Sequence, residues 1–131
     1  MKNLKEFVDQ LVKIEFLDHC NAFGFYPFQM FVEDKEEKVS LCALDLGGEI
    51  GKVYQAFAEY YKEKPKRIYL AVDFPAVGDI ESDFVCIIAA EKDVFTINAL
   101  PYSPNTGEQF TAITKSITLD KILTDLGHFI K

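Results

Sequence analysis

A glycine-rich segment, Asp45–Lys52, is the first part of the sequence whose residue types could bind a ligand. It lies where a predicted strand meets a predicted helix, and the free N–H groups of a helix start suit an anion. The spacing is not that of a P-loop, because three residues separate Gly47 from Gly51 where the motif needs four, and Val53 follows the lysine where it needs Ser or Thr. A tight turn that requires glycine explains these residues more simply, but the N–H of Gly48 is retained as a candidate for binding an anionic group.

Acidic side chains form the second candidate site. If the strands that end near Asp45 and Asp73 are parallel neighbours, both carboxylates lie at the sheet edge where open sheets bind ligands. In an extended chain Asp79, Glu81 and Asp83 would share one side, because alternate residues do. Such a group could hold Mg²⁺ or Ca²⁺, but exposed acids more often only keep a loop solvated, so we expect no metal site. The candidate ligand-binding residues are Asp45, Gly48, Asp73 and Asp79.

Histidine and cysteine chemistry has little support in this sequence. His19 and Cys20 are adjacent, and adjacent residues on a helix do not face each other. Cys42 and Cys86 lie in apolar runs, and no pair of His or Cys has the spacing of zinc ligands. The sequence therefore assigns no catalytic residue, and we expect no cofactor.

Aromatic residues gather before and within the first predicted strand. They are Phe23, Phe25, Tyr26, Phe28 and Phe31. Alternation divides them between the two faces of the strand, and a domain this small has little material with which to cover both faces. Because aromatic residues are enriched at interface centres, Phe25, Tyr26 and Phe28 are candidate interface residues of a homodimer. The alternative is that the N-terminal helix folds back and covers them.

The hydrophobic pattern indicates which elements position these candidates. Apolar residues every three or four positions predict helices over residues 3–19, 50–61 and 118–130. Apolar runs rich in β-branched and aromatic residues predict strands over residues 28–32, 39–46, 67–74, 84–90 and 94–100, with 109–114 as a further candidate edge strand.

The order of these elements predicts part of the topology. The charged residues 33–38 indicate a hairpin between the first two strands. Residues 39–74 are then predicted to form a strand, a helix and a second strand. This order predicts a right-handed crossover between two parallel neighbouring strands. Pro65 ends the central helix and Thr118 is the expected N-cap of the last one. We therefore predict a single α+β domain over residues 1–131, with one mixed sheet of five or six strands and three helices.

Charge and composition exclude several function classes. The 131 residues include 21 acidic and 14 basic ones, and the net charge of −7 repels phosphate backbones and anionic lipids. We therefore expect neither a nucleic acid nor a membrane as partner, and we attribute the basic run 62–67 to a helix C-terminus. Because charges occur early in the sequence, we expect no signal peptide at this N-terminus, and the three scattered cysteines fit a reducing cytoplasm.

These observations favour a non-catalytic cytoplasmic protein that binds or regulates a protein partner. A second copy of the chain, forming a homodimer, is the expected partner. An acidic surface that imitates nucleic acid toward a basic partner is compatible with the same composition. The alternative is a small metal- or anion-binding enzyme with a carboxylate site at the strand ends.

Overall fold

The computed structural model describes residues 6, 29–43, 50–103, 105–106 and 108–130. The elements are β1 (Gln29–Glu33), β2 (Val39–Ala43), α3 (Ile50–Lys62), β3 (Arg67–Phe74), β4 (Asp83–Glu91), β5 (Val94–Tyr102) and α4 (Ile117–Ile130). The predicted helix over residues 3–19 and the glycine-rich turn at 45–49 lie outside the described residues. So do the aromatic residues 23–28.

The five strands form one sheet in the order β2-β1-β3-β4-β5, with every neighbouring pair antiparallel. The α+β class is confirmed, but the predicted mixed sheet is wrong. β2 and β3 do run in the same direction, since each is antiparallel to β1, yet β1 lies between them. The helix α3 therefore connects strands that are not neighbours, because β1 pairs with both of them.

The hairpin of β1 and β2 is confirmed, with Glu33 opposite Val39. Its charged loop is closed by Asp34, whose Oδ1 accepts hydrogen bonds from the backbone N–H groups of Glu36 and Lys38, each 2.9 Å long. A short carboxylate that binds the backbone two to four residues ahead favours a turn over a continued strand. A solvated polar loop therefore sets the register of the hairpin.

The turn between β4 and β5 is also where the sequence predicts it. Lys92 and Asp93 both have positive φ, 51° and 64°, as the two central residues of a type I′ hairpin turn require. The Tyr61 hydroxyl at the end of α3 donates a 2.6 Å hydrogen bond to Asp93, and this bond raises the pKa of Tyr61. The Tyr61 ring also packs on Phe95, with centroids 5.1 Å apart. The turn is thus fastened to the central helix.

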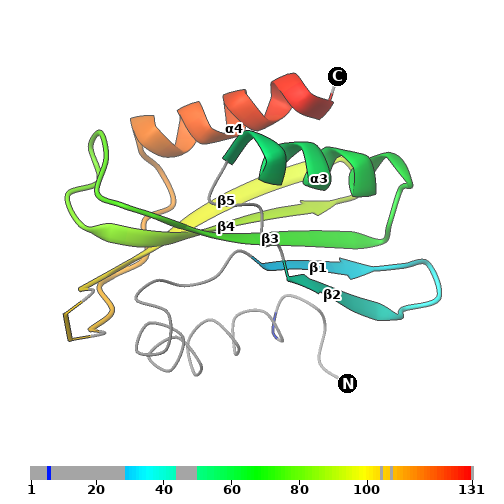
Figure 1. Ribbon diagram of the computed structural model, residues 1–131, viewed down its shortest axis with the longest axis horizontal. Helices are drawn as coiled ribbons and strands as arrows, with labels where there is room; N and C mark the ends of the chain where they lie inside the picture. The colour runs from blue at the N-terminus through cyan, green and yellow to red at the C-terminus, as the bar shows by residue number, and fades with distance from the viewer. Residues whose placement is uncertain (1–5, 7–28, 44–49, 104, 107, 131) are drawn as a thin grey trace.

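Both α3 and α4 lie on the same face of the sheet (Figure 1). The core between them and the sheet contains residues from both helices and from four strands, among them Met30, Phe57, Leu70, Cys86 and Leu126. Tyr54 of α3 and Phe129 of α4 meet edge to face, with ring centroids 5.9 Å apart. Two amphipathic helices thus cover one side of the sheet.

The second face of the sheet carries a separate buried cluster. It consists of Phe31, Tyr69, Ala71, Val85, Ile87 and Tyr102. No helix within the described ranges packs on this cluster, although Phe31, Ala71 and Val85 are 0% exposed. β4 is thus buried on both faces of the sheet, since Cys86 and Ile88 belong to the first cluster and Val85 and Ile87 to the second.

The segment 109–114 does not form the regular strand that its sequence indicated. It follows the edge of β5 through two isolated bridges, Ala99 to Ile113 and Tyr102 to Gln109. The backbone N–H groups of Ala99 and Ile113 donate to each other's carbonyls at 2.8 and 2.9 Å. The segment therefore covers the β5 edge without extending the sheet as a sixth strand.

Candidate functional site

Asp79, one of the four candidate ligand-binding residues, is a helix-capping residue. It lies in the turn between β3 and β4, and its carboxylate reaches the start of α4. Asp79 Oδ2 accepts the N–H of Ile117 and Oδ1 accepts the N–H of Thr118, each at 3.0 Å. Hydrogen bonds with the side chain and backbone of Thr118, together with that from Ile117, lower the pKa of Asp79. The carboxylate thus occupies the place that a bound anion would take at this helix end.

The first four N–H groups of α4 are all satisfied within the protein. Besides the two that Asp79 accepts, the N–H of Leu119 donates to Ser116 Oγ at 3.0 Å and that of Asp120 to the Ser116 carbonyl at 3.1 Å. Ser116 is therefore the N-cap, and the predicted N-cap at Thr118 is wrong by two residues. The periodicity of the apolar stripe did not reveal the first turn, because that turn contributes few core residues.

The side chain of Thr118 makes the reciprocal hydrogen bond to the turn that contains Asp79. Its Oγ1 accepts the N–H of Asp79 at 3.2 Å. Gly78 makes this approach possible, because its φ is +58° and a Cβ there would collide with Thr118 Oγ1. Glycine is the residue that tolerates both demands. The turn and the helix start are therefore one interlocked unit.

Asp73, the second candidate that the structure describes, is engaged elsewhere. The Tyr102 hydroxyl donates to both of its oxygens, at 2.9 and 2.8 Å, and Tyr102 is 1% exposed. This pair belongs to the second face, whereas Asp79 binds a helix on the first face. The structure thus does not bring Asp73 and Asp79 to one site.

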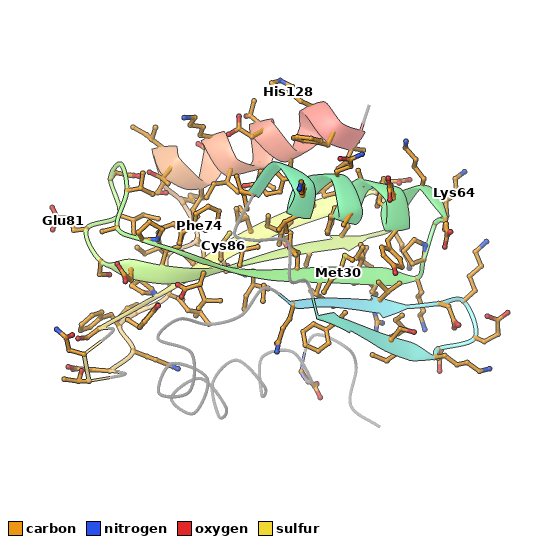
Figure 2. All side chains as sticks on the ribbon, viewed as in Figure 1. Met30, Lys64, Phe74, Glu81, Cys86 and His128 are labelled. Carbon is orange, nitrogen blue, oxygen red and sulfur yellow. The ribbon has the colours of Figure 1, made fainter. Side chains whose placement is uncertain are left out.

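The remaining carboxylates of the acidic series do not converge either. Asp83 Oδ1 accepts the N–H of Ala76 at 3.1 Å, and Glu81 is exposed and points away from the loop (Figure 2). Among the described residues, no group of three or more His, Cys, Asp or Glu could hold a metal ion. Asp45 and Gly48, the other two candidates, lie outside the described residues.

A row of charges across three strands was missed at the level of sequence. Glu33 of β1, Arg67 of β3 and Glu91 of β4 are aligned by the antiparallel register. Arg67 Nη1 lies 3.3 Å from Glu33 Oε1, and its Nε donates to Glu91 Oε1 at 3.1 Å. These contacts, first the hydrogen bond to Glu91, raise the pKa of Arg67. The signal was present as charged residues at the ends of three apolar runs, but strand order was needed to align them.

Glu33 is the buried member of this row, since the residue is 4% exposed. Lys66 approaches it at 3.9 Å and donates a 2.6 Å hydrogen bond to Glu37 in the hairpin loop. This contact lowers the pKa of Glu37. Part of the basic run 62–67 is thus paired with acidic residues within the chain.

The structure describes the surroundings of one cysteine, Cys86, and one histidine, His128. Cys86 is fully buried and free, and burial raises the pKa of its thiol. A buried neutral thiol is a poor nucleophile, because the thiolate is the reactive form. His128 lies on the outer side of α4 in its last turn (Figure 2). Cys86 acts as a core residue.

Comparison with known proteins adds no family assignment. No family model, no curated protein and no solved structure matches this chain. Neither α3 nor α4, the two long helices of the described part, has the length and apolar character needed to cross a membrane.

Proposed function

We propose that this protein acts by binding a protein partner rather than by catalysis, and that a second copy of the chain is such a partner. Asp79 carries the argument, because its two oxygens accept the N–H groups that an anionic substrate would need at α4. A carboxylate held at that position also repels an anion. Asp79, one of the candidate residues of the enzyme alternative, thus has a structural task.

Two further observations support the proposal. Asp73 accepts the Tyr102 hydroxyl and lies on the opposite face of the sheet from α4. Cys86 is free and buried, which fits a reducing compartment such as the cytoplasm. We propose that location together with the binding function.

The oligomeric state of the full chain tests the proposal. We expect sedimentation velocity between roughly 5 and 500 μM to show a monomer–dimer equilibrium, because a small interface gives an affinity on the order of micromolar. A chain that stays monomeric over the whole range would contradict dimerisation.

Thermal melting with and without metal tests the enzyme alternative. A metal bound only by the native state raises the melting temperature by mass action. We expect no change in midpoint with millimolar Mg²⁺, Ca²⁺ or Mn²⁺. A clear rise with one of them would favour the metal-dependent alternative over the binding module.

A further inference from the structure

We infer that residues 108–115 form a displaceable strap over the edge of β5, and that an extended peptide segment of a partner protein takes their place when the strap opens. This inference rests on the proposed binding function and names the surface and the kind of partner. Its basis is that the strap, which runs from the end of β5 toward the start of α4, occupies the edge as an added strand does but is weakly held there (Figure 1).

The strap shows how the β5 edge accepts a strand. The N–H of Ala99 donates to the carbonyl of Ile113 at 2.8 Å, and the N–H of Ile113 donates to the carbonyl of Ala99 at 2.9 Å. The N–H of Phe110 donates to the carbonyl of Pro101 at 2.8 Å. This last contact does not need the N–H that proline lacks. Because all these bonds are between backbone groups, an incoming segment makes them whatever its sequence.

The pairing between the strap and β5 is interrupted. Its two bridges join Ala99 to Ile113 and Tyr102 to Gln109. The bridged residues are three positions apart on β5 but four apart on the strap, so one extra strap residue lies between the bridges and disrupts the ladder. β4, in contrast, pairs with β5 over the whole length of both strands. The strap is therefore attached less firmly than the neighbouring strand.

One side chain anchors the strap. Ile113 is half-buried and packs against the core between the helices and the sheet, whereas the other residues of 108–115 are exposed. Even the ring of Phe110 belongs to a residue that is 47% exposed. A segment with few buried apolar contacts opens at a lower free energy than core strands do. The strap is thus a segment that opens while the sheet stays folded.

Both ends of the strap are fixed to the fold. The N–H of Ser103 donates to the carbonyl of Glu108 at 2.8 Å and closes the loop that precedes the strap. Ser116, which follows the strap, caps α4 by accepting the N–H of Leu119 at 3.0 Å. Opening therefore moves the residues between these two points away from β5 and leaves β5 and α4 in place.

The composition of the strap and of β5 indicates the chemistry of the partner. Because Ile113 is the anchor, the incoming segment needs an aliphatic side chain at the position opposite Ala99. β5 itself, Val94–Tyr102, contains no charged residue, so it lacks the lysine or inward-pointing charge that prevents pairing at many edges. The partner is an extended segment with one buried aliphatic residue among exposed ones.

Hydrogen exchange tests the opening. The Ala99 N–H is bonded to the strap, whereas β4 lies between two strands. In the wild type we expect the Ala99 amide to exchange at least about a hundredfold faster than the slowest amides of β4. Ile113→Asp should increase the Ala99 rate further, and Thr111→Asp, which adds the same charge at an exposed position, should leave it unchanged. Equal wild-type rates at Ala99 and β4 mean that the strap opens only with the whole domain, which overturns the inference.

A peptide with the sequence of residues 108–115 tests the site. It is added to the Ile113→Asp chain, in which the strap has lost its anchor, or to Ile113→Ala if circular dichroism shows that the first variant does not fold. We expect the NMR amide signals of Ala99, Leu100 and Tyr102 to shift as the peptide is titrated. The matched peptide carries Ile113→Asp and should bind at least about tenfold more weakly.

Two outcomes of the titration overturn the inference. They are the absence of any shift at millimolar peptide and equal affinity for the two peptides. Neither depends on dimerisation, so their occurrence leaves the dimer of the proposed function standing. A wild type that stays monomeric in sedimentation velocity contradicts that dimer and leaves the strap site standing.

Discussion

At the scale of single residues, Asp79 shows how an acidic residue in a loop acquires a structural task. Its carboxylate neutralises the positive end of the α4 dipole and accepts two N–H groups that would otherwise lack partners. These partners are 38 and 39 residues away in sequence, so local spacing does not reveal them. The alternation of Asp79, Glu81 and Asp83 is compatible with a cation site, but the loop folds so that Asp79 turns to the helix.

We expect Asp79→Ala to lower the melting temperature by roughly 5 °C, as the loss of a helix cap does in a domain of this size. Because the pKa of Asp79 is lowered in the folded state, its contribution is complete above the ordinary value of 3.8 and is lost as the pH falls through the folded value. Thermal melting of the variant and the wild type at several pH values measures this. The difference between them should shrink as the pH falls below 3.8, and a difference that grows there would contradict the capping role.

Glycine substitutions provide a matched comparison. Gly78→Ala should destabilise the protein by about 2 kcal/mol, because φ is +58° and the new Cβ collides with Thr118 Oγ1. Gly127→Ala within α4 should instead stabilise it by up to about 1 kcal/mol, since nothing lies within 4 Å of the new Cβ and alanine favours a helix. Urea unfolding gives both values. Equal effects of the two substitutions would show that the turn does not need glycine.

At the scale of elements, the charged row joins β1, β3 and β4 at one end of the sheet. Glu33 is buried and has Arg67 as its close cation, whereas Glu91 at the other side of Arg67 is nearly half exposed. An exposed ion pair contributes little to stability, but a buried carboxylate that loses its cation is costly. The two bridges of Arg67 should therefore differ greatly in their energetic importance.

We expect Arg67→Met to destabilise the protein by about 3 kcal/mol, because it leaves the Glu33 carboxylate buried without that cation. Glu91→Gln should cost less than about 1 kcal/mol. Adding Glu33→Gln to Arg67→Met should restore part of the loss, since a neutral amide is cheaper to bury than a charge. Chemical denaturation of the three variants measures these differences. An Arg67→Met protein as stable as the wild type would show that the Glu33 carboxylate does not need the Arg67 cation.

At the scale of the whole molecule, the sheet separates two buried clusters that share the same strands. Successive residues of β3 and β4 alternate between the helix-covered core and the second cluster. Loss of packing on either side therefore acts on the same backbone. One cooperative unit is the expected consequence.

Phe57→Ala in the helix-covered core and Phe31→Ala in the second cluster should each destabilise the protein by about 3–5 kcal/mol, because both side chains are 0% exposed. Each variant should still unfold in one transition that is the same by tyrosine fluorescence and by circular dichroism. Two separated transitions in either variant would show that the clusters unfold independently.

The sequence by itself determined the elements, because each depends on periodic burial and turn chemistry within a few residues. The helix predicted over 50–61, the strands predicted over 67–74 and 84–90, and the charged hairpin all follow from such local patterns and are present in the structure. Burial of Phe31 within the single chain, by contrast, shows that one member of the aromatic group is a core residue and not an exposed interface residue. Periodicity marks a buried face but does not name what covers it.

Only the tertiary structure decided the strand order and the tasks of the acidic residues. A run of apolar residues is compatible with several neighbours in a sheet, so the insertion of β1 between β2 and β3 could not be derived from the pattern of either. Asp73 and Asp79 are divided between the two faces by contacts with Tyr102 and with the start of α4. Such contacts join residues distant in sequence, and their energies depend on packing that forms only when the whole chain folds.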